Sequence, residues 1–309
     1  MPKLSIILVS YNTKQLTEDC LRSLNTYVDL KDIEIIVVDN NSVDGSAEMI
    51  RERFPAIILV ENESNMGFSK GNNIGIRRSS GEYLLLLNTD TIIIEDFVSP
   101  IFEYLEKNKA VGVLGCRVLS KDRELKVTCW NQPNIFTELS FFTVEVIKNI
   151  YSPFAYWKNM QYWDHLSVRE VDCVSGCFMW IRREVVEAVG GLDEDNFMYY
   201  EDTEFCRRVR KHSEYKVVFF PATSIIHLGG ASGDGKEVDP KVIKFSYQSC
   251  CNYLEVAFGK SWQRLFKILC GLIWRVELCV FYLLKRFRPF AKKYNLIKWM
   301  LSKTEVKIV

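Results

Sequence analysis

Short, continuous apolar runs alternate with segments of helical periodicity through the first 115 residues of the chain. The apolar runs comprise residues 4–9, 33–38, 57–60, 83–87 and 111–114. The helical segments comprise residues 16–27, with Thr13 as the expected N-cap, then 44–54, 68–78 and 96–107. Alternating strands and helices predict βαβ units, and continuous apolar strands indicate a mostly parallel sheet that is covered on both faces. The expected fold class is therefore α/β.

The pattern changes after residue 115. Residues 120–170 are rich in Trp, Phe and Tyr and have no clear period, which predicts an irregular or part-helical insertion. Strands are expected again at 171–181 and 216–220, and helices at 183–189 and 203–211.

Charge is distributed unevenly along the chain. The net charge is +1, but residues 260–309 contain twelve Lys and Arg against two acidic residues, so they carry +10 and residues 1–259 carry −9. Such a basic tail indicates a polyanionic partner, either nucleic acid or a membrane surface. The tail has a helical apolar stripe interrupted by Arg275 and Glu277, whereas a membrane span needs about 20 residues with few charges. We therefore expect an amphipathic helix on anionic lipid, with packing on the preceding α/β part of the chain or against a second copy as the alternative.

Cysteine and glycine spacing argue against several classes of protein. The 10 cysteines form no CxxC motif, which argues against a zinc site, and several of them, such as Cys270 and Cys279, lie in apolar runs. We therefore expect them to be reduced and mostly buried, as in a cytosolic protein. The first apolar run is too short for a signal peptide. No G-x-G-x-x-G follows a strand and no G-x-x-x-x-G-K-[ST] occurs, which argues against dehydrogenases and P-loop enzymes. The glycines at 67, 71 and 75 instead fit one face of a closely approached helix.

Polar residues directly follow three of the first four predicted strands. They are Ser10-Tyr11-Asn12, Asp39-Asn40-Asn41-Ser42 and Asn88-Thr89-Asp90. In a parallel sheet these strand ends share one edge, where open α/β folds bind ligands. Asn and Asp also favour turns, but this explanation would have to apply separately at the ends of three strands. The pattern therefore predicts a ligand site with two carboxylates.

Seven motifs occur in an order and spacing that identify a family. They are IILVSYN, IIVVDNNSVDGS, NMGFSKGNNIGI, GEYLLLLNTD, SGCFMWIRREVVEAVGGLDE, FMYYEDTEFCRRVRK and IIHLGGAS. Together they resemble a family 2 glycosyltransferase of the GT-A fold, most closely its rhamnosyltransferase-like branch, over residues 3–233. The resemblance implies a GT-A catalytic domain over residues 1–240, with a nucleotide-sugar-binding half (1–115) and an acceptor and catalytic half (116–240). Residues 241–309 are expected to form a helical, basic C-terminal region.

The resemblance assigns the first motifs to a nucleotide-sugar donor. It places Ser10 and Tyr11 beside the base and ribose, and Asp39 against the base. A carboxylate can accept the N–H of a pyrimidine base, although Asp39 would also suit a turn. Further donor-binding positions implied by the family are Asn12, Asn41, Asn73, Asn88, Thr89, Asp90 and Gly176.

The fourth-strand motif corresponds to the metal motif of the family, which is often Asp-x-Asp. Here Asn88 stands in place of the first acid. By resemblance, Asp90 and His227 hold Mg²⁺ or Mn²⁺ on the donor diphosphate, where the ion would stabilise the charge of the leaving group. Carboxylate oxygen suits both ions, and imidazole favours Mn²⁺.

Glu201 and Asp202 open a predicted helix after an aromatic segment. The helix dipole alone favours acids in a first turn, but aromatic shelter also raises the basicity of a carboxylate. The family places here the base that takes a proton from the acceptor hydroxyl. We assign this role to Asp202, with Glu201 as its partner or replacement, and expect a single displacement that inverts the anomeric configuration.

The expected function is transfer of a sugar, with rhamnose suggested by the branch, from a nucleoside-diphosphate sugar to a saccharide or lipid-linked saccharide in cell-surface polysaccharide synthesis. The basic tail predicts a cytoplasmic enzyme at the inner face of the membrane. One alternative is a sugar nucleotidyltransferase. Another is a degenerate, non-catalytic protein that binds nucleotide sugars or nucleic acid, although the chain has no recognised motif for reading nucleic acid. The sequence leaves the oligomeric state open.

Overall fold

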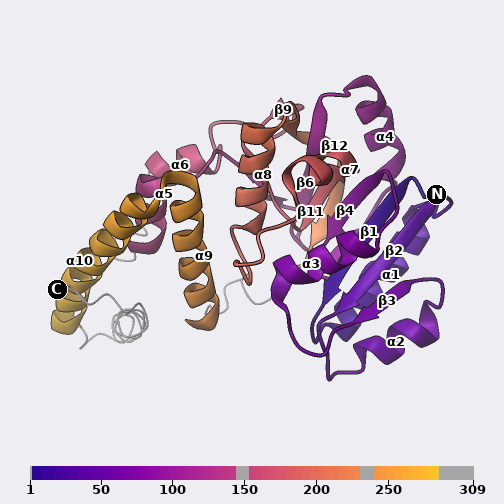
Figure 1. Cartoon of the computed structure of the whole chain (residues 1–309), viewed down its shortest axis with the longest axis horizontal. Coiled ribbons are helices and arrows are strands. Elements are labelled where there is room, and N and C mark those ends of the chain that lie inside the picture. Colours follow the sequence, from indigo (N-terminus) through magenta and orange to yellow (C-terminus); the bar gives the residue numbers. More distant parts are fainter. Residues whose placement is uncertain (1, 144–152, 230–239, 285–309) are drawn as a thin grey trace. The chain divides into compact units, whose positions relative to one another are not determined.

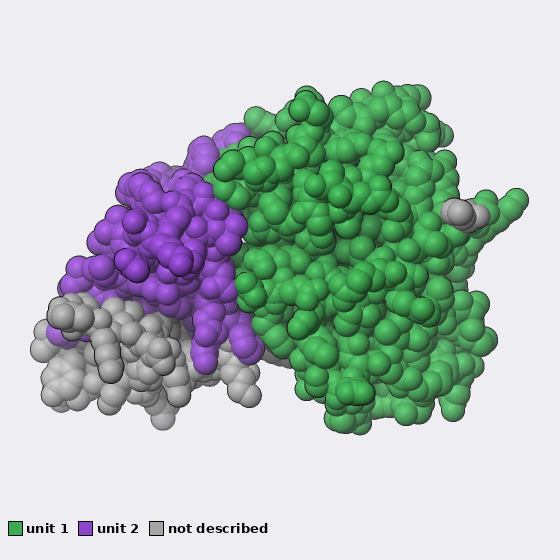
Figure 2. Space-filling model, in the orientation of Figure 1, with its two compact units in different colours: residues 1–132, 163–236 green, residues 133–162, 237–309 purple. Residues whose placement is uncertain are grey.

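The computed structural model describes residues 2–143, 153–229 and 240–284. Two compact units are distinguished in the chain (Figure 2): unit 1 comprises residues 1–132 and 163–236, and unit 2 comprises residues 133–162 and 237–309. The sequence placed residues 133–162 in the catalytic domain, whereas the structure groups them with the C-terminal helices. The domain division at residue 240 stays a prediction.

Unit 1 is built on one large sheet (Figure 1). Its strands are β1 (Leu4–Ser10), β2 (Ile33–Asp39), β3 (Ile58–Glu61), β4 (Tyr83–Leu87), β5 (Thr91–Ile93), β6 (Val111–Leu119), β7 (Leu125–Lys126), β9 (Arg169–Glu170), β11 (Phe178–Arg182) and β12 (Lys216–His227). The order is β3-β2-β1-β4-β11-β6-β12-β5, with β7 on β6 and β9 on β12. Strands β3, β2, β1 and β4 are parallel, and β12 is parallel to β6, while β11 and β5 run antiparallel to their neighbours. The predicted α/β fold with a mostly parallel sheet is confirmed.

Helices cover both faces of the central strands. Those of unit 1 are α1 (Lys14–Tyr27), α2 (Ser46–Arg53), α3 (Gly67–Arg78), α4 (Val98–Lys107), α7 (Arg183–Val189) and α8 (Glu201–His212). On β1, Ile6 shares a core with α1 and α2, whereas Ile7 lies on the opposite face, against α3. A Cβ added at Gly75 would lie 2.4 Å from Ile7 Cγ2, and one at Gly71 would lie 2.8 Å from Val9 Cγ1. The predicted close approach to these glycines is therefore confirmed.

The predicted elements of residues 1–115 are all present, although the strand at 111–114 continues to Leu119. The single strand expected at 171–181 was wrong. A small separate sheet pairs β10 (Cys173–Val174) with β8 (Cys129–Trp130), and the chain turns at Gly176 before β11 begins. Thr13 is the N-cap of α1, but its hydroxyl does not cap the helix, because it contacts the hydroxyls of Ser10 and Thr17 instead.

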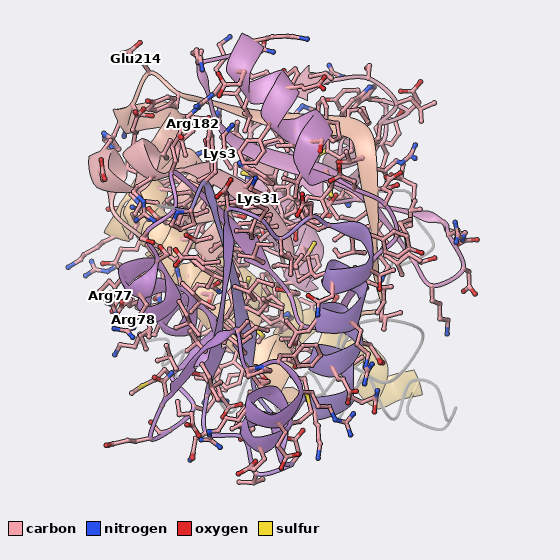
Figure 3. The ribbon with its side chains drawn as sticks, turned by 90° about the vertical axis from the view of Figure 1, so that its right-hand side faces the viewer. Lys3, Lys31, Arg77, Arg78, Arg182 and Glu214 are labelled. Carbon is pink, nitrogen blue, oxygen red and sulfur yellow. The ribbon has the colours of Figure 1, made fainter. Side chains whose placement is uncertain are left out.

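A buried arginine fixes the far end of β11. Arg182 donates hydrogen bonds to Val111 O at 2.7 Å, Leu105 O at 2.8 Å and Tyr83 Oη at 2.6 Å. Its charge is thus buried among satisfied acceptors from three elements, which limits the desolvation cost. Figure 3 shows Arg182 inside unit 1, whereas Arg77 and Arg78 project from its surface. The anchor holds β11 between β4 and β6.

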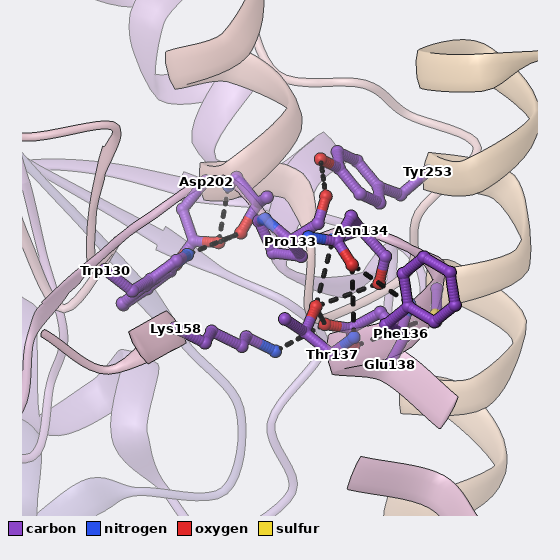
Figure 4. A network of polar contacts seen from close by, with 11 residues as sticks. Trp130, Pro133, Asn134, Phe136, Thr137, Glu138, Lys158, Asp202 and Tyr253 are labelled. Atoms are coloured by element: carbon purple, nitrogen blue, oxygen red, sulfur yellow. Dashed lines mark hydrogen bonds and ion pairs between the residues drawn. The ribbon is translucent and has the colours of Figure 1, made fainter. Parts of the chain in front are cut away.

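Unit 2 is helical and consists of α5 (Ile135–Thr143), α6 (Pro153–Lys158), α9 (Pro240–Phe258) and α10 (Lys260–Leu284). Lys158 Nζ lies 2.7 Å from the fully buried carboxylate of Glu138, and Tyr253 donates to Pro133 O at 2.9 Å (Figure 4). The Trp274 indole N–H donates to Phe142 O at 2.9 Å, which ties α10 to α5. None of the helices that the structure describes is long and apolar enough to cross a membrane.

The ten cysteines all lie in the described part of the chain and are free thiols. All except Cys279 are buried, as the sequence predicted. Burial raises the pKa of Cys20 and Cys206 to about 12. These thiols are therefore core residues of low reactivity.

Candidate active site

The ends of β1 and β2 lie side by side at the carboxyl edge of the sheet. Ser10 pairs with Asp39 in the register, and the Asn40 N–H donates to Ser10 O at 2.8 Å. Beyond them, the Asn12 amide oxygen accepts the Val43 N–H at 2.9 Å. Asn12 has a φ of 54°, a left-handed conformation that asparagine tolerates better than most residues. The two loops that carry the first polar clusters are thus joined, as the sequence predicted.

The hydroxyl of Ser10 points into the protein. It lies 3.2 Å from Thr13 Oγ1 and 3.3 Å from Thr17 Oγ1, and Thr89 Oγ1 reaches Thr13 Oγ1 at 3.3 Å. This hydroxyl network links the ends of β1 and β4 through α1. The ring of Tyr11, in contrast, is half-exposed at 47%. Of these residues, Tyr11 is the one whose side chain is accessible to a ligand.

Asp39 is buried and only partly satisfied. Its Oδ2 accepts the Ser42 N–H at 2.8 Å, but its Oδ1 is buried without a hydrogen-bond partner among the described residues. Leaving a buried carboxylate oxygen unpaired is costly. The atom therefore suits a donor N–H supplied by a ligand.

The two neighbouring asparagines, Asn40 and Asn41, differ in burial. Asn41, the predicted donor contact, is exposed at a φ of 64°. Asn40 is buried instead: its amide donates to Gly67 O at 3.0 Å and accepts from Asn62 at 2.8 Å. Asn40 thereby positions the loop before α3, a role that its place in the motif did not reveal.

A second group gathers where β4 ends. His227 Nε2 lies 3.0 Å from Asp90 Oδ1 and 3.5 Å from the Asn88 amide nitrogen. The antiparallel pairing of β12 with β5 places His227 opposite Thr91 and so brings the imidazole to Asp90. Asn88 Oδ1 is buried without a partner in the described structure. The three residues that the sequence assigned to the diphosphate and metal lie together.

Lys126 is a further residue of this group, and the sequence analysis missed it. The short strand β7 pairs Lys126 with Val118, and the ammonium donates to His227 O at 3.0 Å. Burial raises the pKa of the Cys177 thiol to about 12, and the charge of Lys126 opposes that rise. A positive charge therefore lies close to the position where Asn88 replaces an acid.

A third group forms the start of α8. Tyr199 and Tyr200 both have positive φ, 72° and 64°, which is uncommon for bulky residues and marks a strained entry to the helix. Glu201, next in the chain, is buried, and its Oε2 has no partner within the described residues. The partly buried Asp202 accepts the Gly176 N–H at 3.1 Å and the Thr203 N–H at 2.7 Å.

Burial changes the acidity of both carboxyl groups. It raises the pKa of Glu201 well above the ordinary value, and the charge of Asp202 raises it further. It also raises the pKa of Asp202, against the opposing effect of the N–H groups of Gly176 and Thr203. Raised pKa values of this kind are common at functional sites.

Residues 176–177 connect the group at the end of β4 with the group at the start of α8. The Asn88 N–H donates to Cys177 O at 3.1 Å, while the N–H of Gly176 reaches Asp202. A Cβ at Gly176 would lie 3.3 Å from the ring of Phe68 at the start of α3. The end of β4, the turn before β11 and the start of α8 therefore meet at one edge of the sheet.

The side-chain amide of Asn73, which the sequence assigned to donor binding, forms hydrogen bonds within the protein. Its amide donates to Leu192 O at 2.8 Å and Glu194 Oε1 at 3.0 Å, and it accepts the Leu192 N–H at 2.8 Å. The side chain thus holds the loop at 191–194 to α3. A direct contact of Asn73 with the donor stays a prediction.

Trp130 reaches the same region from β8. Its indole N–H donates to Thr203 Oγ1 at 3.2 Å, next to the carboxylate of Asp202 (Figure 4). An aromatic ring that is only partly buried beside a carboxylate suits the apolar face of a sugar.

The donor set fits a divalent ion that also binds a substrate. No group of three or more His, Cys, Asp or Glu side chains in the described residues could hold a metal alone. Asp90 Oδ1, His227 Nε2 and Asn88 Oδ1, which has no partner among the described residues, offer two oxygens and one nitrogen. Mg²⁺ is commonly bound by one or two carboxylates together with substrate phosphates. The residues therefore fit an ion whose remaining ligands come from a diphosphate.

Curated relatives of the chain are enzymes of glycan synthesis. It is 26% identical to the low-salt glycan biosynthesis hexosyltransferase Agl10 of Haloferax volcanii, over 68% of this chain and 62% of that protein. It is 22% identical to the N-acetylglucosaminyl-diphospho-decaprenol L-rhamnosyltransferase of Mycobacterium tuberculosis, over 72% of this chain and 75% of that protein.

Solved structures share the fold. Residues 1–349 of S. aureus TarS match with a TM-score of 0.55 at 13% identity, covering 87% of this chain and 69% of that one. GalNAc-T7, solved with UDP, GalNAc and Mn²⁺, matches with a TM-score of 0.59 at 14% identity, covering 84% of this chain and 49% of that one. At these identities the likeness establishes the GT-A fold.

The family model described as glycosyl transferase family 2 matches residues 5–190, which is more than half of the chain. That range contains the ends of β1, β2 and β4 and the turn at Gly176. The resemblance seen in the sequence is therefore confirmed, and the chain belongs to glycosyl transferase family 2, with the GT-A fold of a glycosyltransferase.

Proposed function

We propose that the protein is an inverting, metal-assisted glycosyltransferase that moves a sugar from a nucleoside-diphosphate sugar to a hydroxyl of a saccharide or lipid-linked saccharide. The observation that carries the proposal is the meeting of two groups at one sheet edge, Asp90 with His227 and Asp202 with Glu201, through residues 176–177.

The base of the donor nucleotide is assigned to the end of β2. The unpartnered Oδ1 of Asp39 suits the N–H of a pyrimidine base, and the accessible ring of Tyr11 suits stacking beside it. TarS has been solved with UDP and with UDP-GlcNAc, and one relative is an L-rhamnosyltransferase. We therefore propose a pyrimidine nucleotide, with rhamnose as the leading candidate sugar.

The diphosphate is assigned to the end of β4. A bound Mg²⁺ or Mn²⁺ would stabilise negative charge on the leaving nucleoside diphosphate. Asp90, His227 and the amide oxygen of Asn88 would hold it. Lys126, fixed by its hydrogen bond to His227 O, would add a positive charge that attracts the diphosphate directly, where Asn88 leaves the metal ion with one carboxylate fewer.

Asp202 is assigned as the general base. As the acceptor oxygen forms its bond to the anomeric carbon, the bond from that carbon to the diphosphate breaks, and the hydroxyl proton passes to Asp202. The raised pKa of Asp202 suits a proton acceptor. Attack from the face opposite the leaving group inverts the anomeric configuration. Gly176 and Thr203 keep the carboxylate in place through their N–H groups.

The acceptor is proposed from the relatives. The mycobacterial enzyme is named for an acceptor joined to decaprenol through a diphosphate. A lipid-linked saccharide is therefore the first acceptor to test, with free saccharides as the second.

A product assay with a panel of nucleotide sugars tests the function. We expect one donor to release a nucleoside diphosphate and to yield a glycoside whose anomeric configuration, read by NMR, is opposite to that of the donor. Formation of a nucleotide sugar with release of inorganic diphosphate would instead indicate a nucleotidyltransferase. Donor binding without turnover on any acceptor would indicate a degenerate transferase.

A further inference from the structure

Helix α10 has two apolar faces. The buried face, which includes Phe266, Cys270 and Trp274, packs within unit 2. Phe266, for example, lies with its ring centroid 6.2 Å from that of Phe142 on α5. The opposite face carries a second apolar row, here called the exposed stripe: Trp262, Leu265, Ile268, Leu272 and Val276.

The exposed stripe is a continuous surface. Its residues are three or four positions apart, so their side chains are neighbours along one side of the helix. They are 42% to 66% exposed. A helix on the surface of a globular protein normally carries polar residues on its outer face. A long apolar row at this position indicates an interaction surface.

The charges around the stripe have one sign. By helical spacing, the exposed Arg264 and Arg275 border it along one side. Glu277, the only acid in α10, is buried on the opposite face. The sequence that follows, residues 285–309, contains eight Lys and Arg against one Glu. The stripe therefore lies in a strongly basic segment.

We propose that the exposed stripe docks the protein on an anionic lipid bilayer, with α10 lying in the plane of the interface. Its apolar residues would enter the acyl boundary, while Arg264 and Arg275 extend to the lipid phosphates. A second copy is a poorer occupant, because a two-fold contact would bring the same basic borders together. Nucleic acid would neutralise the charge but leave the apolar row exposed to water.

Co-sedimentation of the full chain with vesicles tests the proposal. Vesicles of phosphatidylcholine are compared with vesicles that also contain phosphatidylglycerol. We expect the wild type to bind the anionic vesicles and the combined variant Leu265→Gln, Leu272→Gln, Val276→Gln to lose roughly tenfold or more in partitioning. Arg264→Gln with Arg275→Gln should weaken binding to anionic vesicles alone, and added salt should weaken the wild type in the same way.

A matched control is Leu166→Gln, because Leu166 is an apolar residue of unit 1 that is as exposed as Val276, and its replacement should leave vesicle binding unchanged. Val276→Gln alone, at the most exposed position of the stripe, gives a milder variant if the combined one fails to fold. Equal vesicle binding by the wild type and a folded stripe variant would overturn the proposal. So would a wild-type dimer in light scattering that the stripe variant converts to a monomer without any effect on vesicle binding.

Discussion

Two carboxylates at the same sheet edge have different surroundings. At the end of β4, the Asp90 carboxylate contacts the imidazole of His227 at 3.0 Å. That imidazole lies 3.5 Å from the amide nitrogen of Asn88, whose amide oxygen has no partner among the described residues. At the start of α8, Asp202 accepts two backbone N–H groups beside the buried carboxyl of Glu201. The first environment offers several ligand atoms to a cation. The second raises the pKa of a carboxyl group.

The difference shows how neighbours assign roles to identical side chains. A carboxylate that contacts an imidazole suits a charged ligand that must be held. A carboxyl group that burial makes more basic suits a group that must accept a proton. We therefore expect changes at Asp90 to affect donor binding and changes at Asp202 to affect the chemical step.

The largest effect should come from Asp202→Asn. An amide cannot accept the proton, so we expect the transfer rate to fall roughly 100- to 10,000-fold while the donor dissociation constant stays unchanged. Single-turnover kinetics and calorimetric titration measure the two quantities separately, with the exposed Asp122→Asn as control. In the wild type, the rate should rise with pH through the raised pKa of Asp202, because the base must be deprotonated. If Asp202→Asn turned over at the wild-type rate, Asp202 would not be the general base.

Asp90→Ala should instead weaken the binding of the donor. Loss of a charged ligand should weaken Mn²⁺-supported donor binding by about 10- to 100-fold, with a much smaller effect on binding measured without metal. Asn88→Asp changes the same site in the other direction and should tighten metal binding. Both are measured by titrating Mn²⁺ in the presence of nucleoside diphosphate. Metal enhancement that survives in Asp90→Ala would contradict the assignment.

Lys126→Met should have a smaller effect. Because the ammonium is only partly buried, removing its charge should weaken nucleoside-diphosphate binding about twofold to fivefold. Binding of the nucleoside, which has no phosphates, should not change. Lys126→Arg keeps the positive charge and serves as the control. If both variants weakened nucleoside-diphosphate binding equally, the loss would come from the hydrogen bond with His227 O and not from the charge.

Glu201→Gln should change stability more than binding. The raised pKa of Glu201 means that the folded state disfavours its ionised form, so its contribution is fully present below the ordinary glutamate pKa and lost as pH rises through the raised value. Thermal melts should show wild type and Glu201→Gln alike in acid, with the variant increasingly more stable toward neutral pH. A constant difference across this range would show that Glu201 does not titrate as described.

The sequence predicted the local elements and the grouping of strand ends well, since both depend on periodicity. Asn88 and Asp90 follow a strand of four leucines, and that position alone places them at the sheet edge. It also predicted the close approach at Gly71 and Gly75, because their spacing matches a helix face.

The remaining features depend on contacts between distant residues. Lys126 reaches His227 across 101 positions through a two-residue strand, too short for any periodic signal. Asn40 and Asn41 are adjacent and identical in type, so only their backbone conformation distinguishes the buried one from the exposed one. The association of residues 133–162 with the C-terminal helices likewise has no local pattern.

On this assignment, the sheet edge binds a nucleotide sugar with the help of a divalent ion. Thermal denaturation with a panel of nucleoside diphosphates and nucleotide sugars, each with and without Mn²⁺, tests it most directly, because a ligand that binds only the folded state raises the melting temperature. We expect the melting temperature to rise with one pyrimidine nucleotide, and Mn²⁺ to increase that rise in the wild type but not in Asp90→Ala. A melting temperature unchanged by every nucleotide, with and without the metal, would contradict it.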